Sequence, residues 1–315
     1  MQILLISGFL GAGKTTFIKE IIKRTDKQPV ILENEYGDNN LDSLELQNES
    51  SKKDNEIKIL EFMEGCVCCT MKDSFVNSVF AIYSSISPDY LIIEPTGVGR
   101  LSSIIENLKP LIGPAVSLLE PIVVLSPQTY RNNMKEWPEL YTDQVANAKR
   151  VVFSKCENIP ADEIKEVADE ILKINPGAEI TYEHYSKMDQ EWWDSLMQDP
   201  NGEGASVNTV ASEGEGTDSF SQVSITKAGL HNPGQLIQIL EDCLRGEFGH
   251  VARAKGTLWV NNEILRFDLA DRMYAITDSP DDGCQCVFIG KYLDEKKLRD
   301  RMCGADKNTR RRVMI

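Results

Sequence analysis

Short apolar runs alternate along the first two hundred residues with segments whose apolar residues recur every three or four positions. The apolar or alternating runs have the length of strands, and they lie at residues 3–7, 30–33, 56–61, 90–93, 121–125 and 150–153. The segments with helical spacing lie at residues 15–24, 73–87, 102–108 and 161–174. Strands separated by helices predict βαβ units, and therefore an α/β fold with a mostly parallel sheet and helices on both faces.

The pattern changes after residue 199. Residues 200–218 hold almost no large apolar side chain and many Gly, Ser, Asn and Glu, which predicts a flexible linker. Beyond it, strands are expected at 222–226, 257–260, 264–269, 273–276 and 286–289, and helices at 233–244 and 294–302. This order predicts a smaller α+β domain with a mostly antiparallel sheet. We therefore expect a first domain at 1–199, a linker at 200–218 and a second domain at 219–315.

Composition narrows the range of partners. The 315 residues carry 34 Lys and Arg against 49 Asp and Glu, which gives a net charge of −15. Nucleic acids and anionic membranes bind concentrated positive charge, so neither is expected as the main partner. No apolar run approaches the roughly 18 residues of a membrane span, and the apolar start lacks the basic region of a signal peptide. We expect a cytoplasmic protein.

A glycine-rich segment, GFLGAGKT at residues 8–15, follows the first apolar run and opens the first helical segment. It fits the pattern G-x-x-x-x-G-K-[ST], in which the backbone wraps around phosphates between a strand and a helix. Lys14 is expected to reach the β- and γ-phosphates, and Thr15 to place its hydroxyl on Mg²⁺. The predicted nucleotide contacts are Gly8, Gly11, Ala12, Gly13, Lys14, Thr15 and Thr16.

The apolar run at 90–93 ends in a carboxylate, Glu94. A strand-end acid is the second metal position of P-loop proteins, so Glu94 is expected to hold Mg²⁺ directly or through water. An ordinary strand-end carboxylate is the alternative. Gly97 follows three residues later, at the position where GTPases place the glycine that senses the γ-phosphate.

The run at 150–153 leads into Ser154, Lys155 and Glu157, close to the guanine-reading pattern [NS]-K-x-D. Its carboxylate accepts hydrogen bonds from guanine N1–H and the 2-amino group. Adenine lacks both donors and would leave the carboxylate unpaired. We expect guanine selection, with Glu157 in place of the usual Asp; a solvated loop is the alternative.

Three of the eight cysteines, Cys66, Cys68 and Cys69, lie within four residues. Clustered thiolates favour a soft metal such as Zn²⁺, Cu⁺ or Co²⁺, and no second C-x-x-C pair is present to close a structural zinc site. An incomplete set, finished by a carboxylate or water, suits a metal that must leave again. Redox chemistry and inert burial are the alternatives. Cys284 and Cys286 form a C-x-C that we expect to be structural or else a second contact for a soft metal.

Taken in order, GFLGAGKTT, NEYGD, EGCVCCT, EPTG and SKCE resemble the CobW-like P-loop GTPases. After the linker, RAKG followed by LWV, RFD and VFIG is similar to the CobW C-terminal domain. The resemblance implies a P-loop NTPase fold and GTP hydrolysis coupled to holding and delivering a transition metal, commonly zinc or cobalt. It implies that the three clustered cysteines bind this metal. It also implies that Glu35 and Asp38 of NEYGD lie in the first switch region, near Mg²⁺, the attacking water or the second metal.

The implied cofactors are therefore GTP, Mg²⁺ and either Zn²⁺ or Co²⁺, and the implied partner is a client metalloprotein or a cobalamin-type cofactor pathway. The metal, the client and the oligomeric state stay open at this point. The chain departs from many members in having no His-rich loop, and in Glu157. A scaffold or regulator that responds to nucleotide and metal without catalysis is an alternative function. A small-molecule kinase is another, although no arginine-rich lid segment stands out.

Overall fold

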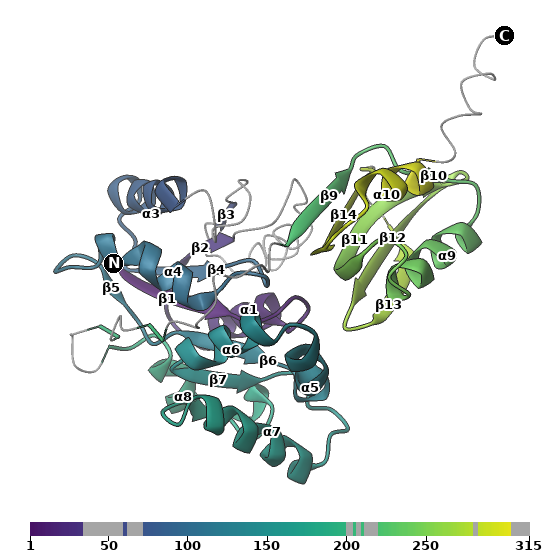
Figure 1. Cartoon of the computed structure of the whole chain (residues 1–315). Helices are drawn as coiled ribbons and strands as arrows, with labels where there is room; N and C mark the ends of the chain where they lie inside the picture. The colour runs from purple at the N-terminus through teal and green to yellow at the C-terminus, as the bar shows by residue number, and fades with distance from the viewer. Residues whose placement is uncertain are drawn as a thin grey trace. The chain divides into compact units, whose positions relative to one another are not determined.

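The structure is a computed structural model that describes residues 1–33, 59–61, 72–199, 204–205, 209–210, 220–279 and 283–303. These residues form two compact units, one within 1–210 and the other within 220–303 (Figure 1). The predicted linker at 200–218 lies mostly outside the described residues. The amide of Ala205 donates to the carbonyl of Leu118 at 2.6 Å, and that of Val210 donates to the Asn147 side chain at 2.9 Å. These pieces of the stretch therefore lie on the first unit, and the limits of the two domains stay a prediction.

Strands and helices alternate along the first unit. Its described strands are β1 (Gln2–Ser7), β2 (Val30–Glu33), β3 (Ile59–Glu61), β4 (Tyr90–Glu94), β5 (Ser117–Leu118), β6 (Ile122–Leu125), β7 (Arg150–Phe153) and β8 (Glu179–Ile180). Its described α-helices are α1 (Lys14–Arg24), α3 (Lys72–Ser85), α4 (Leu101–Leu108), α5 (Pro127–Glu136), α6 (Pro138–Asn147), α7 (Ala161–Ile174) and α8 (Gln190–Ser195). Two 3₁₀ turns are η1 (Lys109–Leu111) and η2 (Tyr185–Lys187).

The strands of the first unit form a parallel sheet. Their order is β3–β2–β4–β1–β6–β7–β8, with the short β5 beside β1, and every described pair is parallel. The apolar runs suit this arrangement, because a strand covered on both faces needs apolar residues at successive positions. Since all strands point the same way, the carboxyl ends of β1, β2, β3 and β4 meet at one edge. The predicted α/β fold is confirmed.

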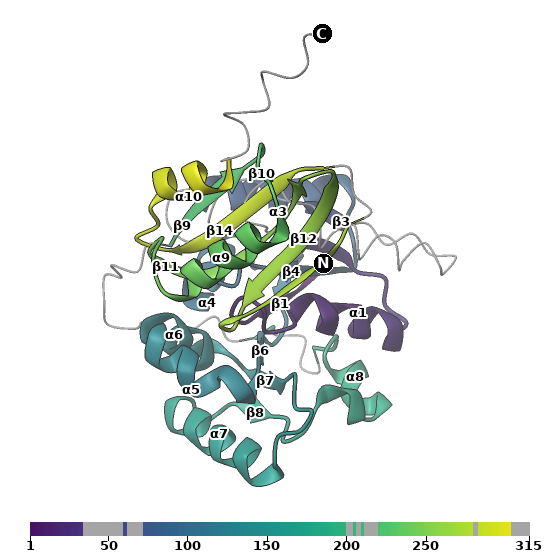
Figure 2. The ribbon, with the colours of Figure 1, turned by 90° about the vertical axis from the view of Figure 1, so that its right-hand side faces the viewer.

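Helices cover both faces of this sheet. On one face, Phe17 and Ile21 of α1 pack with Trp193 of α8 against strand residues that include Ile6 and Val124. Figure 2 shows α1 and α8 on one side of β6 and β7, and α5, α6 and α7 on the other. No helix in the described part of the chain is long and apolar enough to span a membrane.

The second unit has an antiparallel sheet with helices on one face. Its elements are β9 (Ser221–Ile225), β10 (Gly229–Leu230), α9 (Pro233–Leu244), β11 (His250–Val260), β12 (Glu263–Ala270), β13 (Met273–Asp278), β14 (Gln285–Lys291) and α10 (Glu295–Met302). The strand order is β13–β12–β11–β14–β9, antiparallel throughout, and β10 adds in parallel to β11. Leu240 of α9, Leu298 of α10 and Phe288 of β14 are fully buried in one core. The predicted mostly antiparallel sheet is present.

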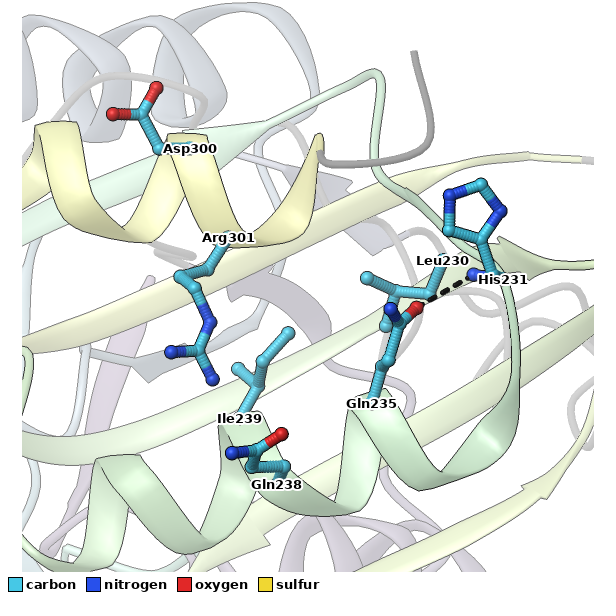
Figure 3. A pocket seen from close by; sticks show the side chains of 7 residues that line it. All are labelled: Leu230, His231, Gln235, Gln238, Ile239, Asp300 and Arg301. Atoms are coloured by element: carbon cyan, nitrogen blue, oxygen red, sulfur yellow. Dashed lines mark hydrogen bonds between the residues drawn. The ribbon is translucent and has the colours of Figure 1, made fainter. Parts of the chain in front are cut away.

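A cavity of about 270 Å³ lies between α9 and α10. Figure 3 shows Arg301 reaching from α10 toward Gln238 and Ile239 of α9. The guanidinium of Arg301 also donates to Asp242 of α9 at 2.8 Å. This ion pair joins the two helices beside the cavity.

Some elements differ from the predicted ones. The helices α5, α6 and α8 were not predicted. α5 and α6 begin with Pro127 and Pro138. Proline is tolerated at the first position of a helix, because an N–H group there would have no intrahelical acceptor. α5 is mostly polar, so its periodicity gives no signal. β11 begins at His250 instead of at 257, because charged residues interrupt the apolar pattern there.

We predict that Phe17→Ala destabilises the first unit by about 3–5 kcal/mol, because it leaves a cavity in place of a buried aromatic ring. Phe17 is 0 % exposed, and its ring lies 5.0 Å from that of Tyr185 and 5.7 Å from that of Trp193. Urea denaturation followed by tryptophan fluorescence measures the change. The control is Phe80→Ala, at a side chain that is 55 % exposed, with an expected change below about 0.5 kcal/mol. Equal effects would contradict the packing of α1 described above.

Candidate functional site

The glycine-rich loop joins the end of β1 to the start of α1, as its sequence predicts. Gly8 has a φ of +142°, and a Cβ at this position would lie 2.2 Å from the carbonyl oxygen of Val124. Only glycine fits there. The N-cap of α1 is Gly13, and within the described residues no side chain caps this helix end. The first amide groups of α1, together with the helix dipole, therefore suit an anion such as a phosphate.

Lys14 lies over this loop. It is only 7 % exposed, and its Nζ donates to the carbonyl of Gly8 at 3.1 Å and to that of Phe9 at 3.4 Å. Nζ is also 4.0 Å from a carboxylate oxygen of Glu94. The loop thus holds a positive charge where P-loop proteins bind phosphates.

Thr15 and Glu94 meet beside Lys14. The Thr15 hydroxyl lies 3.0 Å and 3.1 Å from the two carboxylate oxygens of Glu94, to which it donates. β1 pairs directly with β4, which brings the strand-end carboxylate next to the loop. A hydroxyl and a carboxylate side by side are hard oxygen donors of the kind that Mg²⁺ prefers, so the predicted pair fits this ion chemically.

Gly97 packs against the glycine-rich loop. A Cβ on Gly97 would lie 2.4 Å from the backbone nitrogen of Leu10. The segment around Gly97 is also held by α6, where Nε2 of Gln144 donates to the carbonyl of Gly99 at 3.1 Å. Arg100 in the same segment pairs with Glu139 of α6 at 2.8 Å.

Asp143 of α6 caps the helix that follows this segment. Its carboxylate accepts from the amide of Ser102 at 3.1 Å and from the Ser102 hydroxyl, at the first turn of α4. Asp143 is fully buried, and burial raises the pKa of its carboxyl group while these hydrogen bonds oppose the rise. The contacts from α6 were missed from the sequence, because they connect segments about forty residues apart through tertiary packing alone.

The predicted base-reading loop lies next to the glycine-rich loop. The hydroxyl of Ser154 donates to the carbonyl of Ala12 at 2.6 Å. Lys155 and Glu157 are exposed, and Lys155 has a positive φ of 51°. Cys156 between them is half-buried; burial, with a smaller contribution from the charge of Glu157, raises the pKa of its thiol to about 11. A thiol with this pKa is protonated and unreactive near neutral pH.

The remaining predicted site residues are placed as follows. Thr16 is exposed on the first turn of α1, and Gly11 lies in the loop. Glu35, Asp38, Cys66, Cys68 and Cys69 lie outside the described residues, and their roles stay predictions. Within the described ranges, no group of three or more His, Cys, Asp or Glu side chains is arranged to hold a metal ion.

A second carboxylate, Glu33, lies at the same edge of the sheet and was not predicted. It ends β2 directly opposite Glu94 in the β2–β4 register, so both side chains point to the same face. Glu33 is only 2 % exposed. A signal was present in the sequence, because VILE ends a strand in a carboxylate just as LIIE does.

The parallel sheet, the glycine-rich loop and the Lys14, Thr15 and Glu94 cluster define the P-loop NTPase class of nucleotide-binding proteins. Within this class, the chain belongs to the CobW/HypB/UreG family. Residues 2–182 match the nucleotide-binding domain of the family, and residues 220–305 match the cobalamin synthesis protein CobW C-terminal domain. The expected family is thereby confirmed.

Known proteins similar to this chain include two with zinc in their names. The chain is 24 % identical to the zinc chaperone YjiA of Escherichia coli, over 98 % of this chain and 99 % of that protein. It is 26 % identical to zinc-regulated GTPase metalloprotein activator 1 of Schizosaccharomyces pombe, over 60 % of this chain but only 47 % of that protein. The structure of Zn(II)-bound YjiA GTPase from E. coli aligns with a TM-score of 0.44 and 18 % identity, over 96 % of this chain and 98 % of that one.

We predict that Gly97→Ala weakens nucleotide binding by roughly tenfold to a hundredfold, because the added methyl group displaces the glycine-rich loop by a fraction of an ångström or more. Titration with a fluorescent nucleotide measures the affinity, and circular dichroism checks that the variant is folded. Gly113→Ala is the control, since nothing lies within 4 Å of a Cβ there. Equal affinities for the two variants would mean that the close approach of Gly97 has no role in binding.

Proposed function

We propose that this protein is a GTP-dependent metallochaperone that binds a transition metal, zinc or cobalt, and delivers it to a client metalloprotein or a cobalamin-type cofactor pathway. The observation that carries the proposal is the convergence of Lys14, Thr15 and Glu94 on one phosphate-binding loop, in a chain of the CobW family. The names of its relatives favour zinc as the cargo. We further propose that it acts in the cytoplasm as a GTPase with slow intrinsic turnover.

The nucleotide half of the proposal assigns each residue at the loop a role. The Lys14 ammonium neutralises charge on the β- and γ-phosphates, and Thr15 and Glu94 hold Mg²⁺, directly or through water. Mg²⁺ would neutralise charge on the phosphate oxygens during hydrolysis. Gly97 offers its backbone amide to the γ-phosphate. Glu35 and Asp38 are proposed to approach the same region from the first switch segment.

Guanine selection is proposed for the loop that follows β7. Ser154 fixes the start of this loop through its bond to Ala12, so the distance from the phosphates to the base is set by the fold. The Lys155 stem lies along the base, and Glu157 accepts from N1–H and the 2-amino group. Glutamate is one methylene longer than the usual aspartate, which changes the depth of the pocket rather than its chemistry.

The cargo half of the proposal rests on Cys66, Cys68 and Cys69. Three thiolates leave one position of a tetrahedral zinc ion for an oxygen ligand, and a site that is not closed by four thiolates suits a metal that must be passed on. The segment that contains them follows β3, whose last residue pairs in register with Glu33. Carboxylate oxygens bind zinc alongside thiolates, and Glu33 is a buried carboxylate at that edge, so we propose it as the oxygen ligand that completes the set.

Coupling between the two halves follows from the parallel sheet. The segments after β1, β2, β3 and β4 all leave from the same edge, next to one another in the sheet order. A γ-phosphate that orders the segments after β2 and β4 would therefore act next to the segment after β3, which carries the cysteines. The coupling must be reciprocal at equilibrium, so metal would also change nucleotide affinity.

We predict that Lys14→Ala and Cys68→Ala separate the two functions. Lys14→Ala should weaken GTP binding by roughly tenfold to a hundredfold, because it removes a charged hydrogen bond to phosphate, and should leave zinc affinity unchanged. Cys68→Ala should weaken zinc binding and leave GTP affinity unchanged. Fluorescent-nucleotide titration and competition with a zinc-chelating dye measure the two affinities. The control is Cys243→Ala, at a buried thiol of the second unit; parental zinc affinity in Cys68→Ala would refute the thiolate assignment.

A zinc titration of the reduced protein with Mg²⁺, in the presence of either a non-hydrolysable GTP analogue or GDP, tests the coupling. A tenfold difference in zinc affinity between the two states corresponds to about 1.4 kcal/mol and is the expected result. Equal affinities in the two states would contradict delivery driven by hydrolysis. That result would favour a scaffold whose metal is released by the client alone.

A further inference from the structure

The second unit contains cysteines that the nucleotide site does not use. Cys284 precedes β14 and Cys303 follows α10, and neither forms a disulfide in this structure. Both side chains contact the same bend after β9. The Cys303 Sγ donates to the carbonyl of Lys227 at 3.2 Å, and the Cys284 Sγ donates to the carbonyl of the next residue, Ala228, at 2.9 Å.

A third thiol, Cys286, lies behind this pair in the core. Cys286 is 0 % exposed, and its Sγ donates to the carbonyl of Thr257 at 3.4 Å. Burial raises the pKa of Cys286 well above its usual value, and nearby Cys284 and Cys303 raise it further. Both of these neighbours are partly exposed. Solutes can therefore reach Cys284 and Cys303, whereas Cys286 is shielded and protonated.

The number of donors decides which chemistry the exposed pair supports. Zinc sites in proteins close with three or four protein ligands, and the part of the chain that the structure describes holds no such group. Two thiols that contact the carbonyls of adjacent residues lie near each other, and a disulfide needs only two sulfur atoms. We propose that Cys284 and Cys303 are a redox-sensitive dithiol that hydrogen peroxide converts into an intramolecular disulfide.

The reaction consumes one peroxide for each pair. The Cys303 thiolate attacks one peroxide oxygen, the O–O bond breaks, and a sulfenic acid forms as the other oxygen leaves as hydroxide. The Cys284 thiolate then attacks the Cys303 sulfur, forming the S–S bond and expelling a second hydroxide. The two hydroxides take up the two thiol protons, so the products are one disulfide and two waters. The new bond closes β14 and α10 into a covalent loop, which restrains the unfolded chain.

Peptide mapping of the full-length protein tests this proposal. Trypsin places Cys303 in peptide 302–307 and Cys284 in peptide 273–291. After treatment of the reduced protein with stoichiometric hydrogen peroxide and alkylation of the remaining thiols, we expect these two peptides to be linked. The mass of the linked pair should be lower than the summed masses of the two reduced peptides by two hydrogen atoms, and dithiothreitol should separate the peptides. Treated protein in which Cys303 is a sulfinic acid, or is linked to a cysteine outside 273–291, would overturn the proposal.

Three variants assign the bond within the linked peptides. Cys284→Ser and Cys303→Ser should each abolish the link, and Cys286→Ser, the matched control from the same peptide, should retain it. A link that survives in Cys284→Ser but is lost in Cys286→Ser would refute the pairing. If a variant does not fold, fragmentation of the linked wild-type peptides identifies the bonded cysteine directly.

Discussion

The hydrogen bond between Thr15 and Glu94 is the contact on which the nucleotide site depends. It joins residues 79 positions apart, and it forms because β1 and β4 pair in parallel, with Leu5 opposite Ile93. The Glu94 side chain is only 13 % exposed, and a charge taken out of water must be met by donors or cations. The Thr15 hydroxyl and the Lys14 ammonium meet it. A one-residue slip of β4 would turn Glu94 to the other face of the sheet and remove this compensation.

The loops at this edge are connected through the backbone of the glycine-rich loop. Ser154 bonds to the Ala12 carbonyl, and Gly97 approaches the Leu10 nitrogen. The Gly97 segment is also held by a hydrogen bond from Gln144 of α6. A displacement of the Gly97 segment would therefore disturb its close approach to the glycine-rich loop and the buried hydrogen bond from Gln144. This physical connection is what coupling between nucleotide state and the neighbouring segments requires.

The features that could be predicted from the sequence are those that depend on neighbouring residues in the chain. The glycine-rich loop carries its own lysine and threonine, and Glu94 directly ends an apolar strand, so local pattern was sufficient for both. Glu33 also ends an apolar strand, but its position opposite Glu94 depends on the register between β2 and β4. The sequence of one strand does not define that register. The contacts of α6 depend on packing between distant segments, and the mostly polar sequence of α5 gave no helical periodicity. The roles of Glu35, Asp38 and the three clustered cysteines depend on residues beyond those described.

Most hard and soft donors are separated along this chain, and the separation has a consequence for the two metals of the proposed function. The oxygen donors Thr15 and Glu94 lie beside the glycine-rich loop, whereas the three clustered thiols belong to EGCVCCT and are proposed to share their metal with one carboxylate, Glu33. Mg²⁺ demands oxygen ligands and dehydrates reluctantly, while zinc and cobalt bind thiolates strongly. Because affinity alone would favour the transition metal at most sites, donor type has to direct each ion to its own place. In the function proposed above, exchange of the cargo would then follow the nucleotide state without the cargo displacing Mg²⁺ from the phosphates.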